Sequence, residues 1–355
     1  MTLEELGYRP DLENYRKSHN LEPFMIGRVA SEHRERYHVQ SEQGMLECEL
    51  LGNLRFSAES RSDLPAVGDW VAMSPYDEGK ALIHAVLPRY SILERQAVGK
   101  FGEKQIIATN IDVGIIVLSV NRDFNINRVE RYLTLCHASG IEPMIILTKT
   151  DLITQPEVQQ LLDRIRTRIP EVPLLAVSNL SGQGIDDLKK HILKGKTYCL
   201  LGSSGVGKSS LINSLSGEVR MEIGEISEMI DRGKHVTTHR ELIPMVNGGI
   251  LIDNPGMREV GITDGQSGLE STFGTIYALA GQCKFTDCTH TSEVGCAVLE
   301  AVRNGELDEQ ALENFHKMER ENARFTTSIR EKHKKDKIMG KMFKEVKAHR
   351  KRKKF

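Results

Sequence analysis

Cysteine, long apolar runs and an apolar N-terminus are scarce or missing in this 355-residue sequence. Six cysteines are too few for a disulfide scaffold, and such a low count favours a reducing compartment. No run reaches the roughly 18 apolar residues of a membrane-spanning helix, and residues 1–20 are charged, unlike a secretory signal. With 39% hydrophobic and 27% charged residues, a disordered or collagen-like chain is excluded. We therefore expect a cytoplasmic protein of two or three domains that does not bind membranes.

The net charge of −1 conceals an uneven distribution along the chain. Residues 332–355 contain twelve Lys and Arg residues against two acidic residues, which gives this tail about +10 and residues 1–331 about −11. A basic tail on an acidic body favours an anionic partner such as a nucleic acid. The alternative is a solvated helix end that binds nothing specific.

Short strands separated by glycines fill residues 24–95. The pattern is typical of a small β-barrel, and a five-stranded OB-like barrel fits the length, although an SH3-like barrel has a similar pattern. Barrels of this kind often bind RNA. The candidate phosphate contacts, with solvated surface as the alternative, are Arg28, Arg34, Arg36 and Arg55.

Continuous apolar runs alternate with helical patterns in the middle of the chain, as in a parallel sheet covered by helices on both faces. One expected helix, 127–139, ends at Gly140, and another begins with Thr154 and Glu157 in capping-box spacing. The expected strands are 113–120, 144–147, 172–177, 198–201 and 250–252.

These patterns predict a multidomain protein. The expected divisions are an OB-like β-barrel with an N-terminal extension (1–97), an α/β domain (98–262), a helical domain with a Cys/His cluster (263–331) and the basic tail (332–355).

A phosphate-binding loop is indicated at residues 202–209, where GSSGVGKS matches G-x-x-x-x-G-K-[ST] between an expected strand and an expected helix. The glycines allow backbone N–H groups to surround a phosphate. Lys208 would reach the β and γ phosphates, and the Ser209 hydroxyl would bind Mg²⁺. The predicted nucleotide-binding residues of this segment are Gly202, Ser203, Ser204, Gly205, Val206, Gly207, Lys208, Ser209 and Ser210.

A second segment, TKTD at 148–151, follows an expected strand at the edge where α/β sheets bind ligands. The Asp151 carboxylate can accept hydrogen bonds from N1–H and the exocyclic amino group of guanine, which adenine does not offer in that arrangement. The predicted base-binding residues are Thr148, Lys149, Thr150 and Asp151, joined by Ser178 and Asn179 after the next strand.

Two further segments are typical of nucleotide-dependent switches. Asp253 and Gly256 form a D-x-x-G pattern, in which Asp253 would hold Mg²⁺ through a water and the Gly256 amide would contact the γ phosphate. Thr237 and Thr238 are both candidates for a further Mg²⁺ ligand. The base-binding segments precede the phosphate loop, whereas in ordinary GTPases the phosphate loop comes first. This order predicts a circularly permuted P-loop GTPase domain.

Four potential metal ligands lie close together in the sequence: Cys283, Cys288, His290 and Cys296. Three thiolates and one imidazole fit a single structural, tetrahedral Zn²⁺. The alternative is one disulfide with two bystanders. The remaining cysteines lie in apolar patterns and are expected in the core: Cys48, Cys136 and Cys199.

The permuted motif order resembles the small-ribosomal-subunit-dependent GTPase family RsgA, also called YjeQ or YloQ. The resemblance includes VGDWV (67–71), GSSGVGKSSLIN, DNPGMRE and the Cys/His set. It implies an OB domain, a permuted GTPase domain and a zinc domain. It also implies an enzyme that hydrolyses GTP to GDP and phosphate, is stimulated by the small (30S) ribosomal subunit and acts late in the maturation of that subunit. The implied partners are this subunit, its rRNA, GTP and GDP, and we expect a monomer.

The sequence departs from the family pattern at two positions. Thr148 stands where GTPases most often have Asn, so fewer bonds to the base and the phosphate loop are expected. Val236 replaces a frequent Thr in the G-K-H-x-T-T stretch, which leaves Thr237 and Thr238.

Hydrolysis requires another way to position water, because Met257 follows D-x-x-G where many GTPases have glutamine. A thioether cannot orient a water, so intrinsic hydrolysis should be slow. His235 can accept a hydrogen bond from water and matches the G-x-H element of the family. The predicted catalytic residues are therefore His235 and Lys208, although His235 could instead contact RNA or pack the loop.

Two other functions remain open at this point. Met257 favours an RNA-binding assembly module that uses guanine nucleotide as a structural or regulatory ligand with little hydrolysis. A P-loop ATPase acting on nucleic acid is the other, and Asp151 argues against it because adenine leaves its carboxylate unpaired.

Overall fold

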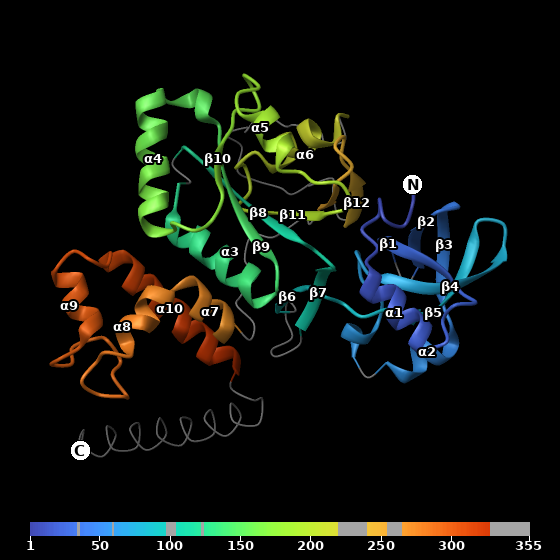
Figure 1. Ribbon diagram of the computed structural model, residues 1–355, viewed down its shortest axis with the longest axis horizontal. Helices are drawn as coiled ribbons and strands as arrows, with labels where there is room; N and C mark the ends of the chain where they lie inside the picture. The colour runs from blue at the N-terminus through green and yellow to red at the C-terminus, as the bar shows by residue number, and fades with distance from the viewer. Residues whose placement is uncertain are drawn as a thin grey trace, which may run out of the picture.

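The computed structural model describes residues 1–33, 36–58, 60–96, 104–121, 124–218, 240–253 and 265–326. A β-barrel is followed by a sheet covered with helices and then by a helical C-terminal lobe, residues 265–326 (Figure 1). The multidomain fold predicted from the sequence is confirmed. Outside the described residues lie His235, Thr237, Thr238, Gly256, Met257 and the basic tail 332–355.

The barrel closes in the order β1-β2-β3-β5-β4, because β4 pairs back with β1. Its β3–β5 pair is parallel and its other pairs are antiparallel. The five-stranded, OB-like barrel predicted for this region is thus confirmed. The elements are α1 (Pro10–Ser18), β1 (Met25–His33), β2 (Arg36–Ser41), β3 (Gly44–Leu50), α2 (Gly52–Ser57), a 3₁₀ turn (Arg61–Asp63), β4 (Trp70–Asp77) and β5 (Lys80–Val86).

The central sheet is parallel in the order β10-β9-β8-β11-β13, and the expected apolar runs form these strands. Helices cover both faces. The capping box of Thr154 and Glu157 is present at α4. The elements are β8 (Val113–Ser119), α3 (Ile126–Ala138), β9 (Glu142–Thr148), a 3₁₀ turn (Thr150–Leu152), α4 (Gln155–Arg168), β10 (Leu174–Ala176), α5 (Ile185–Lys190), β11 (Thr197–Leu201), α6 (Lys208–Ser216) and β13 (Ile250–Asp253).

The pairing of three strands was not foreseen from the sequence. β12 (Glu241–Pro244) runs antiparallel to β13 and touches β1 of the barrel through the pair Ser31 and Glu241. β6 (Ile92–Gln96) and β7 (Lys104–Thr109) form a separate antiparallel pair between barrel and sheet. The strand expected at 172–177 is shorter, because only Leu174–Ala176 pairs with β9.

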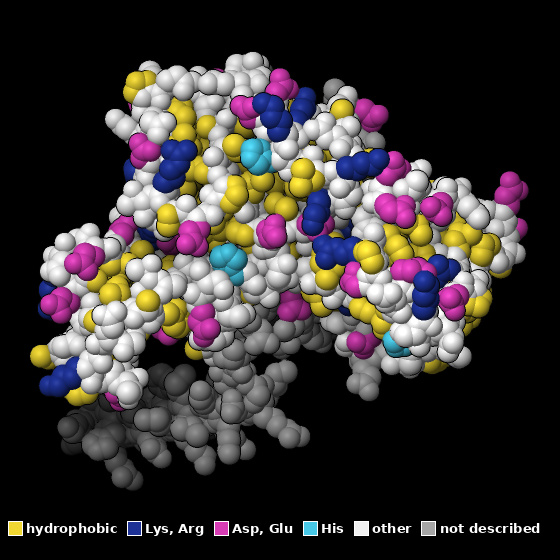
Figure 2. All heavy atoms as spheres, in the orientation of Figure 1, with side chains coloured by type: hydrophobic (Ala, Val, Ile, Leu, Met, Phe, Trp, Pro, Cys, Tyr) yellow, Lys and Arg dark blue, Asp and Glu magenta, His cyan; other side chains and the backbone are white. Residues whose placement is uncertain are grey.

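The C-terminal lobe consists of α7 (Gln266–Thr272), α8 (Gly274–Ala280), α9 (Ala297–Arg303) and α10 (Glu309–Thr326). Its small core is formed by Leu269, Phe273, Ile276, Val298, Leu312, Phe315 and Met318. Among the described helices, none is both long and apolar enough to cross a membrane. The face drawn in Figure 2 carries basic and acidic side chains interspersed, so neither sign of charge dominates it.

The VGDW segment of the barrel is held by the buried carboxylate of Asp69. Arg89 donates to both carboxylate oxygens, with N···O distances of 2.8 and 2.6 Å, and Thr109 Oγ1 donates at 2.6 Å. The backbone N–H of Ala66 adds a bond of 2.8 Å. Since Arg89 precedes β6 and Thr109 is the last residue of β7, Asp69 joins the barrel to the segment that leads into the central sheet.

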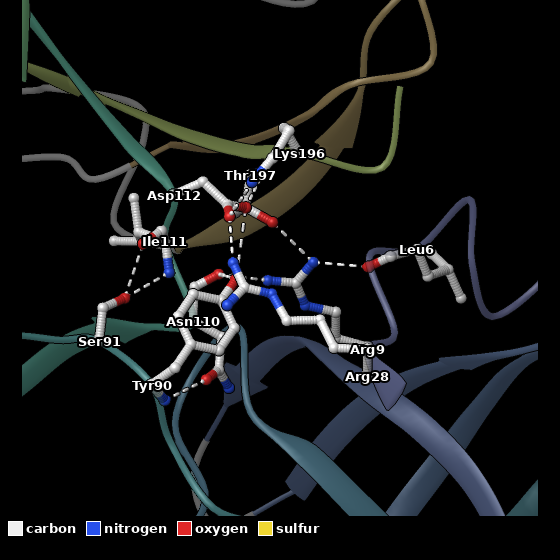
Figure 3. A network of polar contacts seen from close by, with 10 residues as sticks. All are labelled: Leu6, Arg9, Arg28, Tyr90, Ser91, Asn110, Ile111, Asp112, Lys196 and Thr197. Atoms are coloured by element: carbon white, nitrogen blue, oxygen red, sulfur yellow. Dashed lines mark hydrogen bonds and ion pairs between the residues drawn. The ribbon is translucent and has the colours of Figure 1, made fainter. Parts of the chain in front are cut away.

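The barrel and the sheet are joined by Arg28, whose side chain is fully buried (Figure 3). Its guanidinium donates to the carbonyls of Leu6, Gly68 and Asn110 at 2.6, 3.1 and 2.9 Å, and to Thr197 Oγ1 at 2.8 Å. The hypothesis that Arg28 contacts RNA phosphates is therefore wrong, because a buried guanidinium must be satisfied internally.

Asp112 forms a second junction beside Arg28 (Figure 3). Its carboxylate pairs with Arg9 and with Lys196 Nζ, the latter at 3.1 Å, and accepts the Thr197 N–H at 2.8 Å. Tyr90 donates its hydroxyl at 3.3 Å and lies under the Arg9 guanidinium. The N-terminal segment, the linker after β5 and the start of β11 thus meet at one point.

Replacing Arg28 tests this junction. Arg28→Met leaves several buried oxygens without donors, so we expect the free energy of unfolding to fall by about 3 kcal/mol or more. Urea denaturation monitored by Trp70 fluorescence measures it. Arg36→Met is the matched control, because the Arg36 side chain is 63% exposed, and its cost should stay below about 0.5 kcal/mol. Equal effects of the two substitutions would refute the structural role of Arg28.

Candidate functional site

The predicted phosphate loop lies between β11 and α6, at the carboxyl edge of the sheet. Gly202, Gly205 and Gly207 have φ of 151°, 79° and 99°, a region that glycine enters without strain. Lys208 begins α6, and its ammonium donates to the Gly202 carbonyl at 2.8 Å and to the Ser203 carbonyl. Because α6 begins directly after the loop, at Lys208, the free N–H groups of its first turn lie next to the loop, and such groups bind anions.

Asp151 and Ser178 meet at the same edge. Lys149 has a left-handed backbone conformation, with φ of 61°, at the turn after β9. The Ser178 hydroxyl donates to the Asp151 carboxylate and accepts the Ser181 N–H at 3.1 Å. Asp151 is exposed whereas Ser178 is buried, so the hydroxyl fixes the carboxylate while leaving it open to a ligand.

Thr148 contacts the phosphate loop directly. Its buried hydroxyl lies 2.6 Å from the Val206 carbonyl oxygen and 3.2 Å from that of Leu118. The sequence predicted fewer bonds at this position because threonine is shorter than asparagine. A hydroxyl nevertheless keeps the link between the end of β9 and the loop.

The three predicted segments converge on Gly207. A Cβ atom placed there would lie 3.7 Å from Thr148 Oγ1 and 3.8 Å from Asn179 Nδ2. Asn179 also accepts a hydrogen bond of 3.2 Å from Ser214 of α6. Parallel strands bring their carboxyl ends to one edge, so segments 30 to 60 residues apart in sequence form a single site.

Asp253 is the last residue of β13, the strand that pairs with β11. Burial raises the pKa of Asp253 to about 6; the Lys208 charge opposes this shift and Glu241, its cross-strand partner, adds to it. A bound divalent cation would favour the ionised carboxylate in such a desolvated place. The donor set at this edge therefore fits Mg²⁺, which prefers carboxylate and hydroxyl oxygens.

One residue that contacts the phosphate loop was not predicted from the sequence. Arg128, in the first turn of α3, donates from Nη1 to Ser203 Oγ at 2.8 Å. No motif marks this arginine, because its partner lies 75 residues away along the chain.

The four predicted metal ligands converge in the C-terminal lobe, with their ligand atoms all within 4.8 Å of one another. Cys283 Sγ lies 3.8 Å from Cys296 Sγ, and His290 Nδ1 lies 3.6 and 3.4 Å from these two sulfurs. Tetrahedral Zn²⁺ with Zn–S of about 2.3 Å and Zn–N of about 2.0 Å gives edges of about 3.8 and 3.5 Å. This group could therefore bind one metal ion, and its spacing fits zinc.

The surroundings of the cluster favour a thiolate at Cys283, whereas burial raises the pKa of Cys288 to about 11. Burial opposes ionisation of Cys283, but hydrogen bonds from the backbone N–H groups of Ala297 and Val298 help to lower its pKa below the ordinary value. The six cysteines are free, and a sulfur separation of 3.8 Å is far from the roughly 2 Å of a disulfide. Cys48, Cys136 and Cys199 are buried, as predicted.

A phosphate loop joined to T-K-x-D and S-N segments in this inverted order defines a circularly permuted GTPase. The RsgA GTPase family model matches residues 86–263. With this match and the relatives below, the chain belongs to the RsgA GTPase family and is a GTP-hydrolysing enzyme. An ABC transporter model also matches residues 185–348, a range that contains the phosphate loop but not Asp151.

Curated relatives carry the name small ribosomal subunit biogenesis GTPase RsgA. RsgA 1 of Listeria innocua is 46% identical over 84% of this chain and 83% of its own length. RsgA 2 of Vibrio vulnificus is 37% identical over 98% and 95%. The crystal structure of YjeQ from Thermotoga maritima has a TM-score of 0.62 and 28% identity over 83% of this chain and 96% of its own. YloQ, a circularly permuted GTPase, shares the fold with a TM-score of 0.62, over 86% of this chain and 97% of its own, at 23% identity.

Thr148 and Thr150 form a matched pair for testing the loop contact. Thr148→Val leaves the Val206 carbonyl without this donor, so we expect the free energy of unfolding to fall by about 1–2 kcal/mol. The Thr150 hydroxyl is buried without a hydrogen-bond partner among the described residues, so Thr150→Val should be neutral or stabilising. Urea denaturation compares the two. Equal losses would contradict the role of Thr148.

Metal content tests the Cys/His cluster. We expect about one zinc ion per chain by elemental analysis, and its loss in Cys288→Ser because a thiolate ligand is removed. Far-UV circular dichroism should then report loss of helix from the lobe, whose core is small. Cys199→Ala removes a cysteine from the central sheet and should keep the zinc. Full zinc retention in Cys288→Ser would disprove this assignment.

Proposed function

We propose that this GTPase assists late maturation of the small (30S) ribosomal subunit and that the subunit stimulates its hydrolysis of GTP to GDP and phosphate. The observation that supports nucleotide binding is that Thr148, Asn179 and the phosphate loop meet at Gly207. The names of the curated relatives support the ribosomal part. The proposed partners are the small subunit, its rRNA, GTP and GDP, and the protein acts as a cytoplasmic monomer.

The nucleotide is held by two sets of groups. Backbone amides of 202–210 and the Lys208 ammonium bind the phosphates, while Asp151, oriented by Ser178, accepts hydrogen bonds from guanine. Lys149 and Thr150 form the turn that presents Asp151. Adenine leaves this carboxylate unpaired, which gives the site its preference for guanine.

Mg²⁺ bound with the nucleotide neutralises charge that develops on the phosphates during hydrolysis. Ser209 and Asp253 hold it, assisted by Thr237 or Thr238. The Gly256 amide contacts the γ phosphate. His235 accepts a hydrogen bond from the attacking water, the task for which Met257 is unsuited. The subunit activates the enzyme by acting on the segment that carries His235.

The structural ion of the C-terminal lobe is Zn²⁺, held by Cys283, Cys288, His290 and Cys296. It stabilises a lobe with a small core of its own. The basic tail 332–355, with a net charge of about +10, binds rRNA phosphates. GTP favours binding to the subunit, and hydrolysis favours release.

GTP hydrolysis measured with and without purified ribosomal subunits, at one moderate salt concentration, tests this function. We expect at least about tenfold stimulation by the small subunit and none by the large. His235→Ala should lower the stimulated rate by about 100-fold while GDP binding is kept, whereas Lys208→Ala should abolish hydrolysis. Phosphate release that stays at background with small subunits would instead favour a non-hydrolysing RNA-binding module.

A further inference from the structure

Helix α3 contacts the phosphate loop on one side. Arg128 donates to Ser203 Oγ at 2.8 Å, and Tyr132, one turn further along the same side, also has a hydrogen bond with Ser203. Ser203 is the second residue of the loop, and its carbonyl accepts from Lys208. A shift of Arg128 therefore reaches the residue that helps to hold the phosphate-binding lysine.

The neighbouring side of α3 is bound to the C-terminal lobe (Figure 1). Arg131 donates to both carboxylate oxygens of Glu321 on α10, each at 2.6 Å. Buried Glu130 accepts from Asn314 of α10 at 2.5 Å and from Arg168 at 2.6 and 2.9 Å. These charge-assisted bonds are the strong kind, and the Arg131 pair is bidentate.

Helix α7 adds backbone contact between the lobe and α3. A Cβ atom at Gly268 would collide with the carbonyl oxygen of Thr134, so the two helices approach as closely as glycine permits. The Thr134 hydroxyl also lies 3.1 Å from Thr272 Oγ1. The lobe and α3 are therefore packed to move as one body.

The contacts of α3 with the lobe are stronger than its contacts with the phosphate loop. The lobe side combines a buried charged network with close backbone packing, whereas Arg128 is exposed and reaches the loop with its side chain alone. A displacement of the lobe should therefore move α3 with it and change the contacts that Arg128 and Tyr132 make with Ser203. This route is separate from the chain connection through residues 254–264.

We propose that α3 couples the C-terminal lobe to the phosphate loop, with Arg128 as a positioning residue that acts through Ser203. The inference rests on the proposed nucleotide site. Because coupling of binding free energies is reciprocal, a partner that displaces the lobe alters nucleotide affinity, and the nucleotide alters affinity for that partner by the same factor.

A double-mutant cycle on the full chain tests the coupling. The dissociation rate of a fluorescent GDP analogue is measured for the wild type, Arg128→Ala, Glu321→Gln and the double variant. Glu321→Gln breaks the lobe contact far from the nucleotide, and we expect it to change the rate by about 2- to 10-fold. In the Arg128→Ala background this effect should shrink to the part that the Tyr132–Ser203 hydrogen bond transmits. Arg128→Lys, which keeps a donor for Ser203, should restore part of it.

Controls separate coupling from damage to the fold. Glu47→Gln breaks an exposed pair with Arg36 on the barrel, 2.7 Å in length, and should leave the rate unchanged. Zinc content and circular dichroism confirm that the lobe is intact, and Arg131→Lys replaces Glu321→Gln if that variant does not fold. Glu321→Gln acting equally in both backgrounds, or not at all, would overturn the inference alone. Failure of the wild type to bind the analogue would overturn the proposed function as well.

Discussion

The candidate site depends on the hydrogen bonds that hold β9, β8, β11 and β13 side by side. These bonds bring the ends of the strands to one edge, where Thr148, Gly207 and Asp253 belong to different segments of the chain. The order of the segments along the chain has no influence on this edge. A circular permutation therefore keeps the chemistry and changes only which parts of the molecule are joined to it.

Much of this arrangement follows from local sequence. The apolar runs specify buried parallel strands, the Thr154–Glu157 box starts α4, and the spacing from Cys283 to Cys296 suffices to gather four ligands. In each case the determinants lie within one element or one loop, so residue type and spacing are enough to predict the outcome. The short strand β12 gave no such signal, because it exists only through pairing with β13 and β1.

What could not be predicted depends on partners distant in sequence. Arg28 has the residue type of a surface contact on a barrel, and only the carbonyls of Leu6 and Asn110 and the Thr197 hydroxyl turn it into a buried junction. Arg128 likewise acquires its role from Ser203, 75 residues away. A long polar side chain can serve solvent, a ligand or the protein interior, and its own sequence neighbourhood does not decide among them.

The continuity of the sheet has a consequence for solubility. Unpaired strand edges invite pairing with other chains, which leads to aggregation. In the described part of the chain, β12 covers the edge of β13, β1 meets β12 at the single pair Ser31 and Glu241, and the barrel closes on itself through β4. The opposite end of the sheet is β10, with three residues. Both ends of the central sheet are thus short strands, β12 with four residues and β10 with three, and short edge strands limit edge-to-edge association.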